Sequence, residues 1–148
     1  MPPRGRAEGR LVIRIVVALL ASASALATAA PLCGSDLRGT QTLESAAYVI
    51  AYRWRPAKIE VGKPFSLDIV TCPKGSAPTP AGLAVDAFMP EHGHGMNYKA
   101  SVKTPAVGKP ARFLAEGLMF HMPGRWDLYF DVQSSAGTER LTRRIVLE

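Results

Sequence analysis

Residues 124–132 read Gly124-Arg125-Trp126-Asp127-Leu128-Tyr129-Phe130-Asp131-Val132. Apolar residues alternate here with residues that carry a polar group, and Pro123-Gly124 precedes the run as a turn signal. Successive side chains of a β-strand point to opposite faces, so a period of two residues puts Trp126, Leu128 and Phe130 on one face. The stretch therefore predicts a strand with one buried face.

The same alternation recurs through most of the chain. It appears in residues 45–54, 65–73, 83–89, 96–102, 112–121 and 141–147, with a break at Gly117. Pro- and Gly-containing segments separate these runs, and helix-period apolar stretches are missing after residue 30. About seven to eight short strands at this spacing predict an all-β domain, an antiparallel β-sandwich with Greek-key links.

The N-terminus has the features of an export signal. Residues 1–14 carry four arginines against Glu8, and an apolar run from Ile15 leads into a small-residue tract that contains Ala27-Thr28-Ala29. This order predicts a secretory signal peptide over residues 1–29. The alternative is an uncleaved membrane anchor, which the Ala/Ser/Thr-rich second half of the run disfavours. We therefore expect a mature N-terminal segment over 30–44, a β-sandwich over 45–148, and a periplasmic or secreted protein.

The charge balance argues against a nucleic-acid partner. The net charge of the whole chain is +6, and residues 1–29 account for four arginines and one glutamate, which leaves +3. Arg140, Arg143 and Arg144 lie on a predicted strand and form no basic run. Contact with a membrane is expected only if the N-terminal segment stays uncleaved.

The two cysteines, Cys33 and Cys72, both follow the predicted cleavage point. A pair of cysteines in an exported protein is more often a disulfide than two free thiols. The alternative, a pair of thiolate metal ligands, is weaker because the cysteines are far apart in sequence and lie outside the segments that contain histidine. The sequence therefore predicts a disulfide that ties the N-terminal segment to the domain.

Histidine and methionine gather in two short segments. Residues 89–98 contain His92, His94, Met89 and Met96, and residues 118–124 contain His121, Met119 and Met122. In a strand, residues two apart share a face, as His92 and His94 would, and as Met119 and His121 would. If the two segments meet at one end of the sandwich, imidazoles and thioethers converge there.

This set of side chains favours copper. Imidazole suits Cu(II) and zinc, whereas the soft thioether selects Cu(I). Zinc fits less well, because no cysteine lies in either segment and no carboxylate has an evident ligand spacing. The candidate ligands are His92, His94 and His121 with Met96 and Met119. Glu91 is a candidate for fixing the tautomer of His92, and Gly93 and Gly95 are expected to allow a tight loop through positive φ.

Each of these residues also has a structural interpretation. Methionine is a common core residue, and Met89 and Met122 share faces with apolar neighbours, whereas Met96 and Met119 fit either role. A histidine on a strand is more often hydrogen-bonded in the structure than bound to a metal. Catalysis has little support, because the sequence contains no nucleophile-elbow pattern and no phosphate-binding glycine loop.

The motifs resemble a known family. Residues 61–67, the Met-Pro-Glu-His-Gly-His run within 87–96 and the Met-Pro-Gly-Arg-Trp run within 117–126 resemble the YtkA-like domain, which is related to the FixH-like group. The resemblance covers about residues 45–147. It implies an immunoglobulin-like sandwich, a periplasmic or cell-surface location, and a link to copper handling and cytochrome oxidase assembly. The family's motif residues correspond here to Met89, His92, His94 and Met122.

The leading hypothesis from the sequence is an exported, non-enzymatic copper-binding module. It would act as a chaperone or metal buffer and exchange copper with a periplasmic partner protein. The alternative is a structural or protein-interaction β-sandwich without a metal, whose histidines only order a loop.

Overall fold

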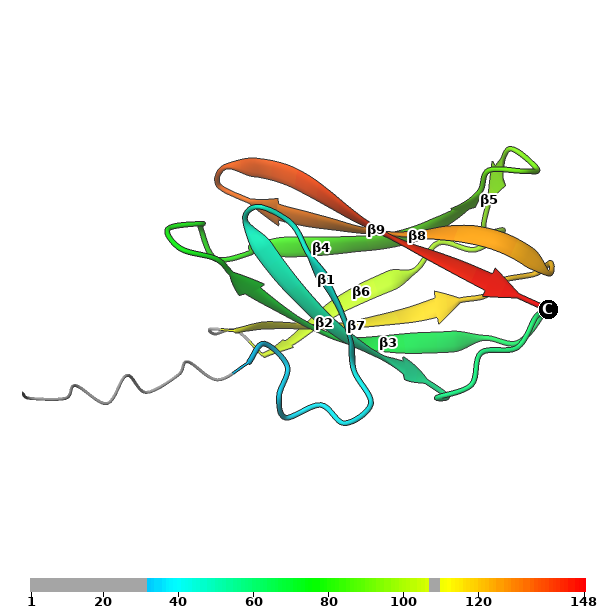
Figure 1. The fold of residues 1–148 in the computed structure, drawn as a ribbon, viewed down its shortest axis with the longest axis horizontal. Coiled ribbons are helices and arrows are strands. Elements are labelled where there is room, and N and C mark those ends of the chain that lie inside the picture. The colour runs from blue at the N-terminus through cyan, green and yellow to red at the C-terminus, as the bar shows by residue number, and fades with distance from the viewer. Residues whose placement is uncertain (1–31, 107–109) are drawn as a thin grey trace, which may run out of the picture. The chain divides into compact units, whose positions relative to one another are not determined.

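The computed structural model describes residues 32–106 and 110–148, which form two antiparallel sheets (Figure 1). The nine strands are β1 (Gln41–Glu44), β2 (Tyr48–Arg55), β3 (Phe65–Pro73), β4 (Gly82–Met89), β5 (His94–Gly95), β6 (Ser101–Ala106), β7 (Ala111–Leu118), β8 (Gly124–Ser134) and β9 (Gly137–Leu147). The predicted all-β sandwich is confirmed. Among the described residues, no helix is long and apolar enough to cross a bilayer.

One sheet has the strand order β1-β2-β3-β7-β6 and the other has β5-β4-β8-β9. The alternation that decided the fold class lies in β8, at the centre of the second sheet, where β4 and β9 pair with it on either side. Trp126, Leu128 and Phe130 are fully buried between the sheets. Burial of a large apolar side chain stabilises a fold by roughly 1.5–3 kcal/mol, so β8 anchors the core.

Prolines and glycines set the strand ends. Pro56 follows β2 directly, as expected for a residue that cannot donate to a ladder. Gly124 begins β8 with a φ of +115°, and a Cβ at this position would lie 2.7 Å from Cε of Met89. A side chain at residue 124 would therefore clash with the end of β4, which fixes how closely the two strands approach.

β1 was not predicted as a strand, because it is short and largely exposed and so lacks an alternating pattern. Two strand predictions need correction. The run 96–102 is not one strand, because residues 96–100 link β5 to β6. β7 continues through Gly117 and ends at Leu118, so Met119 and His121 lie in a link and not on one strand face.

The predicted disulfide between Cys33 and Cys72 is present. It ties the segment before β1 to β3. Gly34 lies so close to β2 that a Cβ on it would be 2.4 Å from that of Ala51, and the segment thereby covers Ala51 and Val70 on the outer face of the sheet. The predicted signal peptide, residues 1–29, lies outside the described residues.

Candidate metal site

The first half of the site is the tight turn that joins β4 to β5. The carbonyl of Met89 accepts hydrogen bonds from the amides of His92 (3.2 Å) and Gly93 (2.9 Å), and Gly93 has the predicted positive φ, +69°. Gly95 does not have a positive φ; it pairs with Phe88 inside β5. Of the two glycines, only Gly93 therefore supplies the positive φ that was predicted for the tight turn.

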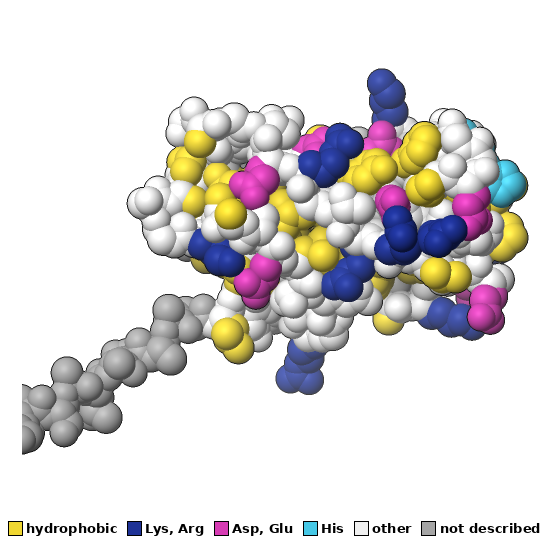
Figure 2. Space-filling model, turned by 45° about the horizontal axis from the view of Figure 1, so that its top comes forward, with side chains coloured by type: hydrophobic (Ala, Val, Ile, Leu, Met, Phe, Trp, Pro, Cys, Tyr) yellow, Lys and Arg dark blue, Asp and Glu magenta, His cyan; other side chains and the backbone are white. Residues whose placement is uncertain are grey.

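The strand register decides where His94 points. His94 lies directly opposite Met89 in the antiparallel pair, and opposite residues share a face of the sheet. Met89 is fully buried, so this face is the core face. His94 is therefore half-buried at the end of the sandwich, whereas His92 is exposed in the turn. Figure 2 shows histidine side chains on the surface at one end of the domain.

The second half of the site is the link between β7 and β8. Phe120 is buried in the core, and its carbonyl accepts a hydrogen bond from the amide of Gly62 (2.8 Å). The carbonyl of Met122 accepts from Nε1 of Trp126 (3.0 Å). These two anchors hold the link on either side of His121 and explain why the segment leaves the β ladder.

The two halves meet where His94 stacks on His121. Their ring centroids are 5.1 Å apart, with an angle of 30° between the ring planes. Trp126 packs edge-on against both rings, at 6.0 Å from His94 and 5.4 Å from His121. The exposed ring of His92 lies 5.8 Å from that of His94. The two histidine segments, whose meeting the copper hypothesis requires, thus lie together, with His94 in the middle.

Trp126 was missed as a member of the site. From the sequence, Trp126 was predicted only as a core residue of the strand in 124–132. Its position shortly after the segment that contains His121 is the signal that could have placed it in the site.

The hydrogen bonds of the two stacked rings differ. Nδ1 of His94 lies 3.0 Å from the carbonyl oxygen of Gly95. A carbonyl can only accept, so this contact is a hydrogen bond when Nδ1 carries the proton, which leaves the lone pair of Nε2 free. Histidines that bind metals commonly have this arrangement. Nδ1 of His121 is buried and has no hydrogen-bond partner among the described residues. Such an atom costs about 1–3 kcal/mol unless something else pairs with it.

The methionines are placed as follows. Met89 is fully buried and belongs to the core. Met96 and Met122 are partly buried and pack against the core. Met96 follows β5 directly, and its amide donates to the carbonyl of Ala87 (3.2 Å). Met119 is partly buried in the β7–β8 link, two residues before His121. All four thus lie in, or next to, the two histidine segments.

Glu91 interacts with a different partner from the one predicted. Its carboxylate forms an ion pair with Arg125, the second residue of β8. Both side chains are about half exposed, so the pair contributes little to stability. The pair links the β4–β5 turn to β8, and it occupies the carboxylate that was expected to orient His92.

Within residues 32–106 and 110–148, no group of three or more His, Cys, Asp or Glu side chains is arranged to hold a metal ion. The rings of His94 and His121 are stacked, with an angle of 30° between their planes. A site of two imidazoles and a thioether fits Cu(I), a soft ion that also tolerates low coordination numbers.

Next to the site, Asp127 is nearly buried and accepts two hydrogen bonds from Arg144, at 2.8 and 3.2 Å. These hydrogen bonds hold the pKa of the Asp127 carboxyl below its usual range, against the smaller opposing effect of burial. This ion pair fixes β9 against β8 beside Trp126.

Comparison of the chain with family models, with curated proteins and with solved structures finds no match. The resemblance to the YtkA-like domain therefore stays a prediction from the motifs.

Proposed function

We propose that this protein is an exported, non-enzymatic copper-binding module that acts as a chaperone or metal buffer. His94 and His121 are its central ligands, His92 is a third imidazole, and Met96 and Met119 supply thioethers. Copper is its cargo, exchanged with a donor or acceptor protein in the same compartment. The resemblance to the YtkA-like domain adds the assembly of respiratory oxidases as the setting.

The observation that carries the proposal is Nδ1 of His121, which is buried beside the ring of His94 and has no hydrogen-bond partner among the described residues. A folded protein rarely leaves a buried polar atom unpaired without a functional reason. A metal ion that binds this nitrogen would remove the penalty, and Nε2 of His94 is free to join it. The disulfide supports the choice of ligands, because an oxidising compartment makes cysteine thiolates unavailable and thioethers remain.

One observation favours the metal-free alternative. His94, His121 and Trp126 pack against one another, and aromatic packing of this kind stabilises a loop without any ligand. On this alternative the histidines order the end of the sandwich, and the protein acts through its surface.

A competition titration separates the two functions. The full chain is titrated with Cu(I) and with Cu(II) against a chelator of known affinity, and the variants H94A, H121A and H92A are compared with it. We expect a loss of about 100-fold or more in Cu(I) affinity for H94A and H121A, since each removes a ligand worth several kcal/mol, and a smaller loss for H92A. Tyr98→Ser is the matched control, because Tyr98 is exposed in the link after β5 and is not one of the proposed ligands. Equal copper affinity in the wild type and all four variants would contradict the proposed site and support the metal-free alternative.

A further inference from the structure

One side of the sandwich is only partly closed. β1 pairs with β2 from Gln41 opposite Tyr52 to Glu44 opposite Val49, whereas β2 continues to Arg55. Within the described residues, Arg53, Trp54 and Arg55 therefore have no strand partner on the β1 side. β9 is the edge strand of the other sheet and runs along the same side to Leu147 (Figure 1). Beyond the end of β1, two strand edges are left open.

A groove of about 420 Å³ lies between these edges. We call it the β2–β9 groove. Its apolar lining comes from Trp54, Ile59, Ile145 and Leu147, all partly exposed. Exposed apolar side chains gathered in a groove indicate a binding surface more than scattered ones do.

The charge of the groove has one sign. Lys58, Arg143 and Arg144 line it, and no Asp or Glu of the described residues does. Arg143 donates from Nη2 to the carbonyl of Thr42 (2.7 Å), but its Nε is buried and has no hydrogen-bond partner in the described part of the chain. Arg144 is paired with Asp127, so the cations that the groove offers a ligand are Lys58 and Arg143, and these favour a ligand with carboxylates.

Among the described residues, no strand pairs with β2 along the line on which β1 would continue. The residues before β1 turn away at Gly39, which has a φ of +70°, and a Cβ at this position would meet no heavy atom within 4 Å. Open backbone along β2 offers N–H and C=O groups with which an extended polypeptide can pair, as in strand addition to a sheet edge. A peptide can form such a row of backbone hydrogen bonds, whereas a lipid or a small acid cannot.

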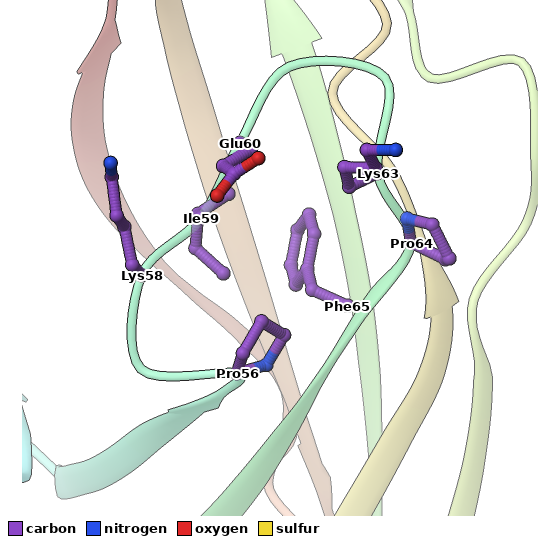
Figure 3. Close-up of a pocket in the computed structure, with 7 residues that line it drawn as sticks. All are labelled: Pro56, Lys58, Ile59, Glu60, Lys63, Pro64 and Phe65. Carbon is purple, nitrogen blue, oxygen red and sulfur yellow. The ribbon is translucent and has the colours of Figure 1, made fainter.

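A second pocket lies beside the groove at the link between β2 and β3. It has a volume of about 280 Å³, and its apolar lining includes Pro56 and Ile59 of the link and Phe65 at the start of β3; Figure 3 shows Ile59 and Phe65 facing each other across it. Its charged lining is Lys58, Glu60 and Lys63. Lys58 and Ile59 line both pockets, so the two adjoin at this link. The second pocket suits one apolar side chain of a bound segment.

We propose that the β2–β9 groove binds an extended segment of a partner protein in which acidic and apolar residues alternate. The segment continues β1 along β2, its carboxylates face Lys58 and Arg143, and an apolar side chain enters the pocket between Ile59 and Phe65. Binding at this groove needs no copper, so the groove can be tested independently of the proposed metal site.

The test is a selection followed by mapping. A random octapeptide library displayed on phage is selected on the full chain, and the most enriched peptide is synthesised and titrated into ¹⁵N-labelled protein. We expect enriched peptides with alternating acidic and apolar residues, and amide shifts confined to 40–41, 53–65 and 143–147. Enrichment of neutral or basic peptides, no enrichment, or shifts elsewhere would overturn the proposal.

A charge-reversal variant completes the test. Lys58→Glu should weaken the peptide about tenfold or more, whereas Lys99→Glu, an equal change of charge on the exposed β5–β6 link, should leave the affinity within about twofold. Arg143→Glu is less suitable, because Arg143 also joins β9 to β1 and its loss can affect folding. Equal weakening by both lysine variants would show general charge attraction and contradict a built groove. Binding to phosphatidylglycerol vesicles that Lys58→Glu abolishes would reassign the groove to membrane surfaces and also overturn the proposal.

Discussion

The imidazole rings of His94 and His121 stack with their centroids 5.1 Å apart, although one belongs to β5 and the other to the link between β7 and β8. This contact, and not the spacing of His92 and His94 in the sequence, makes the candidate site a two-segment structure. Each segment is anchored on its own: the carbonyl of Met89 holds the first, and the amide of Gly62 holds the second. The contact between the two histidines therefore depends on the folded structure that brings the two segments together.

The first prediction concerns the stability of the metal-free protein. His121→Leu removes the unpartnered Nδ1, so we expect a free energy of unfolding equal to that of the wild type or about 1 kcal/mol higher, together with a loss of Cu(I) affinity. Urea unfolding of the apo proteins measures the first quantity. A loss of about 2 kcal/mol or more would mean that His121 serves the structure, which is what the metal-free alternative requires.

The second prediction tests the contact between Gly124 and Met89. Gly124 and Gly137 have nearly equal φ angles, +115° and +116°, but only a Cβ at residue 124 would meet another side chain. Gly124→Ala and Gly137→Ala therefore share the same backbone strain, and only the first adds a clash in the core. We expect Gly124→Ala to be less stable than Gly137→Ala by about 1–3 kcal/mol in chemical unfolding. Equal losses would show that Met89 moves aside without cost.

The third prediction concerns the disulfide. Cys33 and Cys72 are 39 residues apart, and a cross-link of this span stabilises a fold by about 2–4 kcal/mol, chiefly by constraining the unfolded chain. We expect the double variant C33S/C72S to lose about this much in urea unfolding. Thiol titration of the denatured, unreduced wild-type protein should find no free thiol. Two free thiols would contradict both the disulfide and the oxidising compartment.

The fourth prediction is a dependence of stability on pH. The pKa of Asp127 is lowered in the folded protein by its hydrogen bonds from Arg144. A lowered folded pKa stabilises the fold above the unfolded pKa of about 4, and this contribution is lost as the pH falls through the folded value. The urea midpoint of the wild type should therefore fall more steeply below about pH 4 than that of Asp127→Asn. Parallel curves would show that the Asp127–Arg144 pair does not contribute.

Much of the fold could be predicted from local alternation, because β3, β4, β8 and β9 each bury one face. The failures have physical causes. β1 is held by its pairing with β2 and is mostly exposed, so its sequence carries no burial pattern. Residues 119–121 alternate like a strand, but the hydrogen bond from Gly62 to Phe120 draws them into a link.

The histidines of the candidate site could be predicted from the sequence, but the way in which their side chains face one another could not. The copper hypothesis required the two segments to meet, and the rings of His94 and His121 bring them together. The ion pair of Glu91 with Arg125 depends on the register of β4 against β8, which brings the start of β8 to the end of β4, and no local pattern encodes that register. The stacking of His94 on His121 likewise follows from pairings between distant strands.

The central claim is that His94 and His121 hold copper together with a methionine thioether. X-ray absorption at the copper edge of the Cu(I)-loaded full chain tests it most directly. Because both cysteines are in the disulfide, any sulfur bound to copper must come from methionine. We predict a first shell with both imidazole nitrogen and sulfur, and loss of bound copper in the double variant H94A/H121A. A shell of oxygen and nitrogen alone that is unchanged in this variant would contradict the account.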